Sequence, residues 1–433
     1  MKQAEQQFEY GLNQRVPFLK SVLFGLQWAA LIISSMIILG KVVGDLHSSD
    51  PLARIIYLQK LLFLHATTLV CQVLWGHRLP LIVGPSSVLL IGIIASQGFG
   101  LSAIYSSVMI GGLFVAILGV SGYLRYFQRL FTTNVVAVVL LLIAFTLTPT
   151  IRDLMTGSRT GINPLHSLFF GFALVFLVFL CHGLLRQTLK STLVIWAVIG
   201  GSVLYYLVFP AAQGEDLFSG GPWVSHFFQH MTLHVTIHPG VLLSFVFCFM
   251  ALTINDLSSI QAVMELIEPK DTEDRMARGI SFTGLANIAC GFFGVIGPVN
   301  YSLSPGVMMS TKCASRFTLL PAAAIMVILS FFPAATGFVA NVPNVVIGAV
   351  LGYVLTMQIA TGLFVALRDA EGGGFQFENG LIIGLSILLG TMIAFLPEQI
   401  LSTLPSFLRP VLGNGFVVGV VTALLLNHVI LRR

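Results

Sequence analysis

The chain has 433 residues, of which 56% are hydrophobic and only 9% charged, and its mean hydropathy is +0.93. So little charge cannot cover the surface of a water-soluble protein of this length, so the composition excludes a soluble fold and predicts a polytopic helical membrane protein. The net charge of +5 does not indicate a nucleic-acid partner, because most Lys and Arg residues fall in predicted loops on one side of the membrane.

Apolar runs of about 20 residues, the length that crosses a bilayer as a helix, recur along the chain. We predict fourteen spans, at residues 18–42, 53–76, 80–98, 102–123, 132–149, 165–186, 190–209, 240–261, 279–296, 304–316, 317–337, 343–366, 376–396 and 408–430. The first run is too long for a signal peptide and is taken as a span. The distribution of basic residues predicts cytoplasmic N- and C-termini. We expect a multi-pass protein of the plasma membrane. The five scattered cysteines predict neither a disulfide nor a metal site.

Two of these spans cannot be ordinary helices. The third begins "LPLIVGPSSVLLIGII", an extended stretch at Leu81–Val83 followed by Gly84 and Pro85, and the tenth begins "GPVNYSLSPGVMMS", in which Ser304 and Pro305 open a helix. Ser is expected to cap the free N–H groups there, and Pro in the first turn loses no hydrogen bond. We therefore predict a short β-strand and a half-helix in each of these spans.

Both breaks fall in the third span of a seven-span half. An odd number of spans per half inverts the second half, so the fold class is an all-α polytopic membrane protein of two inverted seven-span repeats. Interrupted spans in matching positions indicate a transporter's binding site, because unwound backbone is tolerated where it lines a cavity. The alternative is that Pro and Gly only kink two packed helices.

Five stretches resemble the nucleobase and ascorbate transporter family of nucleobase:cation symporters, which includes bacterial uracil and xanthine permeases, with this chain as a divergent member. The stretches are "GLQW" (25–28), "GHRLPLIVGPSS" (76–87), "RGISFTGLANIACGFFG" (278–294), "PGVMMSTKCASR" (305–316) and "PNVVIGAVL" (343–351). The resemblance implies a core domain (residues 1–123 and 210–337) that moves against a gate domain (residues 124–209 and 338–433). It also implies a homodimer formed through the gate domain.

In that family the substrate lies between the eighth span and the strands of the third and tenth. The family's eighth-span carboxylate falls on Asn255 and its His on Ser259, the tenth-span signature falls on residues 303–306, and an aromatic residue of the third span falls on Ser87. Asn255 brings hydrogen-bonding groups without charge. The expected substrate-binding residues are Ser86, Ser87, Asn255, Ser259, Ser302, Leu303, Ser304 and Gly306.

Asp256 is the acidic residue placed well inside a span, and such carboxylates are usually functional. We expect it to carry coupling to H⁺ or Na⁺, with no other cofactor. The alternative is a structural role, in which Asp256 pairs inside the core domain, for instance with a Ser or a backbone amide.

Four histidines recur at steps of four residues, at His226, His230, His234 and His238. The spacing fits a metal site, but the tract is β-branched and lacks a nearby carboxylate, so a wet surface or gating role is expected instead. The Gly-rich stretch 371–380 indicates a loop, and no nucleophile–base–acid set is found, so an enzyme is not expected.

The sequence thus predicts a secondary active transporter of a purine or pyrimidine nucleobase or related small heterocycle, in contact with the lipid bilayer. The alternative is an anion transporter or facilitator with the architecture of the sulfate permeases. A third class, a membrane sensor or enzyme that moves no solute, is kept for comparison.

Overall fold

The computed structural model describes residues 8–157, 162–185, 190, 192–210, 231–232, 234–333, 336–337, 341–368 and 376–431. Within these ranges eight helical stretches are long and apolar enough to cross a membrane, with α7 and α8 counted as one stretch. The longer helices are α2 (Phe18–His47), α3 (Pro51–Leu74), α5 (Leu101–Val120), α9 (Pro164–Leu184), α12 (Pro239–Ile267), α13 (Thr272–Phe293), α17 (Asn344–Arg368) and α18 (Phe377–Ala394).

Shorter elements connect or complete these helices. They are β1 (Val83–Pro85), α4 (Ser87–Ala95), η1 (Gln97–Phe99), α6 (Leu124–Leu130), α7 (Thr133–Thr146), α8 (Thr148–Thr156), α11 (Leu193–Val208), β2 (Pro298–Asn300), α14 (Ser304–Thr311), η3 (Arg316–Thr318), α15 (Leu319–Ser330), α19 (Glu398–Leu401), α20 (Arg409–Leu412), α21 (Gly415–Leu425) and η5 (Leu426–Ile430). The expected combination of a mostly helical fold with two short strands is confirmed.

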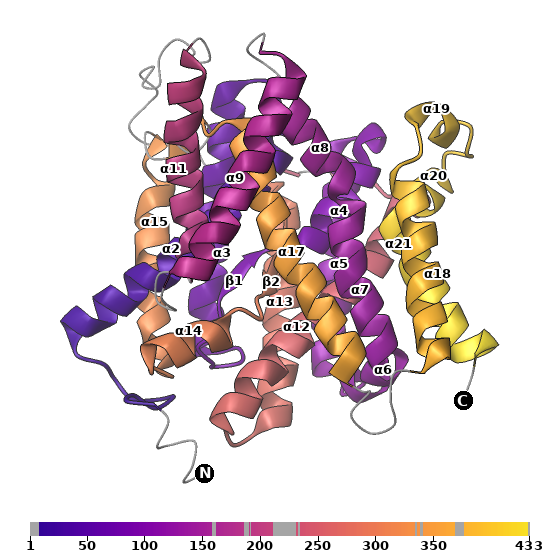
Figure 1. Ribbon diagram of the computed structural model, residues 1–433. Helices are drawn as coiled ribbons and strands as arrows, with labels where there is room; N and C mark the ends of the chain where they lie inside the picture. Colours follow the sequence, from indigo (N-terminus) through magenta and orange to yellow (C-terminus); the bar gives the residue numbers. More distant parts are fainter. Residues whose placement is uncertain are drawn as a thin grey trace.

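The two strands pair with each other near the middle of the bundle, although more than 200 residues separate them in the sequence (Figure 1). β1 and β2 are antiparallel, with Val83 opposite Asn300 and Pro85 opposite Pro298. The expected strand at Leu81–Val83 is therefore wrong by two residues. Pro85 can lie in this strand because a two-stranded ladder leaves one edge of each strand unpaired, so a missing N–H breaks no bond there.

A half-helix follows each strand. Ser86 caps α4, since its Oγ accepts a hydrogen bond from the Leu89 N–H at 3.3 Å. α14 begins at Ser304 with Pro305 in its first turn, but the expected capping role of Ser304 is wrong. The Ser304 Oγ accepts from the Ile82 N–H at 3.0 Å and donates to the Tyr301 carbonyl at 3.1 Å. The hydroxyl therefore ties α14 to the chain entering β1, because that backbone N–H has no ladder partner.

Small residues bring helices of one group into close contact. α13 packs along α5, and a Cβ on Gly284 would overlap the backbone of Ala116. Close backbone approach at glycine is the usual way in which membrane helices gain packing energy. A second group of helices is formed by α7, α8, α9, α17, α18 and α21. Asn414, the N-cap of α21, bridges the groups by donating to the Ser244 Oγ of α12 at 3.1 Å.

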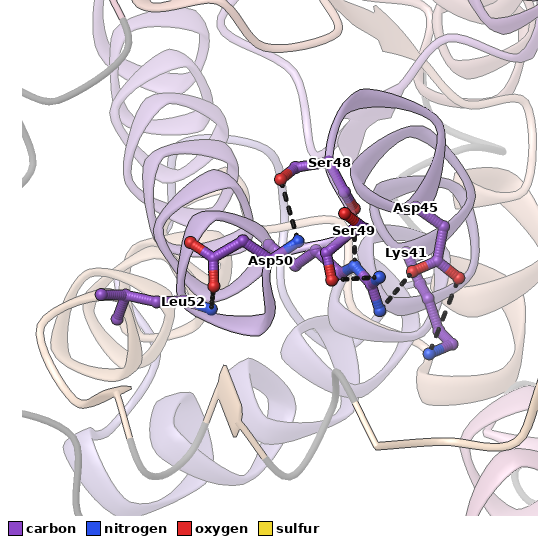
Figure 2. A network of polar contacts seen from close by, with 7 residues as sticks. Lys41, Asp45, Ser48, Ser49, Asp50 and Leu52 are labelled. Atoms are coloured by element: carbon purple, nitrogen blue, oxygen red, sulfur yellow. Dashed lines mark hydrogen bonds and ion pairs between the residues drawn. The ribbon is translucent and has the colours of Figure 1, made fainter.

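The turn between α2 and α3 contains a network of charges (Figure 2). The Asp45 carboxylate lies 3.2 Å from Arg54 Nη1 and 4.0 Å from Lys41 Nζ. Arg54 also donates to the carbonyls of Ser48 and Ser49, both at 2.8 Å, which satisfies acceptors at the end of α2. We call Lys41, Asp45 and Arg54 the turn cluster. It holds two cations around one carboxylate with little access to water.

The N-terminal segment 8–16 lies along residues 312–316, which follow α14. The Glu9 N–H donates to the Lys312 carbonyl at 2.8 Å, and the Ala314 N–H donates to the Tyr10 carbonyl at 2.9 Å. The two stretches therefore form a parallel bridge. The Ser315 Oγ donates to the Gln14 carbonyl at 2.6 Å. This segment is therefore attached to the same part of the fold as α14.

Candidate functional site

Strand β2 and the two half-helices lie against α12 (Figure 1). The Asn300 N–H donates to Asp256 Oδ1 at 2.7 Å, which ties β2 to the middle of α12. α4, β2 and α14 all contact this helix. The elements expected to form the site are thus brought together, with the start of each half-helix next to a strand.

The expected substrate-binding residues differ in how far they are accessible. Ser302, Leu303 and Gly306 are exposed, whereas Ser87 and Asn255 are partly buried. A Cβ on Gly306 would meet no atom within 4 Å, so a side chain there would enter open space. The start of α14 therefore presents free backbone to its surroundings.

The other three expected residues use their hydroxyls inside the fold. Ser86, Ser259 and Ser304 are fully buried or nearly so. Ser259 Oγ donates to the Asn255 carbonyl at 2.8 Å, and the other two make the bonds given above. These hydroxyls fix the backbone of the half-helices and of α12, while the open polar edge comes from their neighbours.

Asp256 is completely buried, and both carboxylate oxygens accept hydrogen bonds. Oδ1 accepts from Asn300 N–H and Oδ2 from the Thr283 hydroxyl of α13, both at 2.7 Å. No ion pair to Asp256 occurs within the part of the chain that the structure describes. Both partners are neutral: the backbone amide is one that the structural alternative named, and the hydroxyl belongs to a threonine instead of the serine named there.

Further polar side chains behind Asp256 were missed by the sequence analysis. Gln72 of α3 donates from Nε2 to Thr283 Oγ1 at 3.0 Å and to the Gly279 carbonyl at 2.9 Å, and its Oε1 accepts from the His77 N–H at 3.3 Å. On α13, Asn287 Nδ2 donates to the Pro298 carbonyl at 3.0 Å and so holds the start of β2. A signal was present, because Gln72 and Asn287 are amides within apolar runs, which membrane interiors disfavour.

Of the four regularly spaced histidines, His226 and His230 lie outside the described residues. His238 caps α12, since its Nδ1 accepts from Val241 N–H at 3.4 Å, and His234 is exposed. Among the residues that could be placed, no group of three His, Cys, Asp or Glu side chains is arranged to hold a metal ion. The first half of the Gly-rich stretch 371–380, residues 371–375, also lies outside the described ranges.

The chain resembles known transporters in sequence and in fold. It is 23% identical to the xanthine permease of Bacillus subtilis over 421 residues, which cover 95% of this chain and 94% of that protein. It is 24% identical to the nucleobase transporter PlUacP of Paenibacillus larvae, with 82% and 80% covered.

In fold, the chain is similar to the transmembrane domain of the cyanobacterial bicarbonate transporter BicA, with a TM-score of 0.61 at 16% identity over 88% of this chain and 97% of that one. Murine Slc26a9, an anion transporter, gives a TM-score of 0.57 at 12% identity, with 96% and 68% covered. The permease family model Xan_ur_permease matches residues 19–399. By that match the chain belongs to the Xan_ur_permease family of permeases.

Proposed function

We propose that this protein is a secondary active transporter, a cation symporter for a purine or pyrimidine nucleobase or a related small heterocycle. The observation that carries the proposal is the pair of half-helices, which start beside two paired strands and against α12, in a chain of the permease family. Relatives named for xanthine and for nucleobases, matched over most of their lengths, support this substrate class. A permease moves its solute unchanged, so no enzymatic activity is proposed.

We also propose fourteen crossings in two inverted halves, with core and gate domains at the boundaries given above. The antiparallel pairing of β1 with β2 supports this arrangement, because inversion of one half reverses the direction of its third span. Packing supports it too, since α5 lies against α12 and α13, while α7 lies against α17, α18 and α21. In the proposal both termini are cytoplasmic, and two copies associate through the gate domain.

The proposed substrate site lies at the start of the half-helices. Ser87, Asn255 and Ser302 provide polar groups with access from outside, and the first turn of α14 provides free N–H groups beside Gly306. A nucleobase has N–H donors and carbonyl or ring-nitrogen acceptors on one planar edge. The Asn255 side chain offers both an acceptor and two donors, which matches such an edge without charge.

We further propose that Asp256 carries the coupling proton. A carboxylate surrounded by neutral donors can gain or lose a proton without breaking an ion pair. The Asn300 N–H that it accepts belongs to β2, next to the substrate site. Proton binding at Asp256 would therefore change the hydrogen bonding of the strand that positions α14.

Uptake by proteoliposomes tests the proposal. Labelled xanthine, uric acid or uracil should accumulate when a pH gradient is imposed, and an excess of unlabelled base should compete. Flux of bicarbonate or sulfate that is insensitive to bases would instead favour the anion transporter, whose fold BicA shares. Absence of flux with every one of these solutes would contradict both transport readings and leave a sensor.

Two substitutions at the start of α14 test the site. Gly306→Leu should raise the KM for the base at least about tenfold, because the new side chain enters the open space in front of the free N–H groups. Pro305→Ala keeps the helix start and should change the KM less than about threefold. An unaltered KM in Gly306→Leu, measured by initial uptake rates, would place the substrate elsewhere.

A further inference from the structure

Thr283 differs from other helical threonines of this chain. Thr68, Thr146 and Thr253 each donate their hydroxyl to the carbonyl four residues earlier in the same helix, at 2.7, 2.6 and 2.7 Å. This local bond is the usual choice for a threonine inside a helix. Thr283 donates instead to Asp256 Oδ2 on another helix. The local acceptor for the Thr283 hydroxyl would be the Gly279 carbonyl, so we ask which other donor occupies that carbonyl.

Gln72 provides the reason. Its Nε2 donates one hydrogen to the Gly279 carbonyl and the other to Thr283 Oγ1. The carbonyl that Thr283 would otherwise use is thus occupied, and a lone pair of the hydroxyl oxygen is occupied as well. The hydroxyl hydrogen is left with Asp256 as its acceptor.

Gln72 is itself held in one orientation. Its Oε1 accepts from the His77 N–H, so the amide cannot flip without losing that bond. Gly76 leaves the necessary room, because a Cβ at this position would overlap Gln72 Oε1. Arg275 donates to the carbonyls of His77 and Arg78, both at 3.1 Å, and so fixes the turn after α3.

We propose that Gln72 is a positioning residue for proton coupling, which commits the Thr283 hydroxyl to Asp256 and thereby stabilises the ionised carboxylate. The inference rests on the proposed function in one respect, that Asp256 is the site where the coupling proton binds. It deepens that function by assigning the control of protonation to a residue of α3 that touches neither substrate nor proton.

Other titratable groups around Asp256 are few. The backbone of His77 and the guanidinium group of Arg275 belong to the same chain of hydrogen bonds. Among the elements packed against α12, α4, α7, β2, α14 and α21 contain no charged residue, and α5 contributes only Tyr105. The remaining groups are on α13 and α20, at Glu273, Asp274, Arg275, Arg278, Cys290 and Arg409. The charged residues of α13 lie in its first two turns, away from Thr283.

Infrared titration of purified protein in lipid measures the protonation of Asp256 without requiring transport. The carboxylic acid band of Asp256 is identified by its loss in Asp256→Asn. In Gln72→Met the Thr283 hydroxyl is free to turn to Gly279, so the midpoint of this band should move to higher pH by about one unit, the usual effect of one hydrogen bond to a charged group. Thr283→Val should produce a similar shift, and Thr283→Ser should restore most of the original midpoint.

The double variant decides whether Gln72 acts through Thr283. In the variant that combines Gln72→Met with Thr283→Val, the midpoint should shift no further than in Thr283→Val alone. Once the Thr283 hydroxyl is absent, loss of Gln72 can no longer turn it away from Asp256. Gln59→Met is the matched control, since Gln59 is a buried glutamine of α3 whose amide has no hydrogen-bond partner in the described part of the chain. It should leave the midpoint unchanged.

An unshifted midpoint in Gln72→Met, or independent and additive shifts in the double variant, would overturn the inference. If Gln72→Met does not fold, Gly76→Ala, which displaces the same amide, should give the shift in its place. Uptake by the same preparations tests the role of Gln72 and the proposed function separately. If the midpoints shift as expected but the protein moves no base, the role of Gln72 is retained and the proposed function is contradicted.

Discussion

Asp45 and Asp256 are both carboxylates that the fold removes from water, and their partners differ in kind. Asp45 lies in the turn cluster beside the cations Lys41 and Arg54, whereas Asp256 accepts from the hydroxyl of Thr283 and from the backbone N–H of Asn300, which are neutral donors. Loss of the negative charge between two poorly solvated cations would leave those cations uncompensated. Neutral donors impose no such condition. The comparison teaches that cationic partners indicate a structural role for a buried acid, whereas neutral donors are compatible with proton binding.

The largest effect on stability is expected at the turn cluster. Asp45→Asn should lower the free energy of unfolding by about 3 kcal/mol, because two cations with little access to water lose the negative charge that compensates them. Asp50→Asn is a matched control in the same turn, because Asn caps helices as well as Asp and can accept from Leu52 N–H. It should change stability by less than about 0.5 kcal/mol. Thermal unfolding in detergent compares them, and equal losses would contradict the assignment.

Asp256→Asn should show the opposite balance of effects. Accumulation driven by a pH gradient should fall at least about tenfold, because the amide cannot titrate, while base exchange at equal pH should stay within about twofold. Its loss of stability should be about 1 kcal/mol, that of a neutral hydrogen bond, and so smaller than in Asp45→Asn. Undiminished pH-driven uptake would show that the coupling proton binds elsewhere.

The smallest effect is expected at a third carboxylate, which is exposed. Glu9 lies 2.8 Å from Lys20 Nζ, and hydrogen bonds from Lys20 and Tyr10 hold the pKa of Glu9 below its usual range. The pair therefore stabilises the folded protein at pH values above the pKa that Glu9 has in the unfolded chain. This stabilisation is lost as the pH falls through the lower pKa that Glu9 has in the folded protein. Glu9→Gln should therefore lower the unfolding temperature slightly at neutral pH, and added salt should reduce the difference. A large, salt-independent loss would show that the pair is not screened by solvent.

The sequence analysis predicted the parts of the fold that depend on local chemistry. Pro85 and Pro305, each next to serine, marked both helix breaks, and apolar runs located the longer helices, although some helix ends differ by six or seven residues from the predicted ones. The use of Ser304 was not predictable, because its partner Ile82 is 222 residues away. The same is true of Gln72 and Thr283, which are 211 residues apart. Asp256 was recognised because a charge inside an apolar run is conspicuous, but the identity of its partners depended on tertiary packing.

The attachment of segment 8–16 to residues 312–316 gives the protein an intrinsic place for an optical reporter. Gly11 is exposed, and a Cβ there would meet no atom within 4 Å, so a dye can be attached without disturbing the parallel bridge. Such a dye would travel with the half-helix of the proposed core domain. A second dye at the exposed Val429 of η5 would belong to the proposed gate domain. Energy transfer between the two positions would then report domain movement in single molecules during turnover.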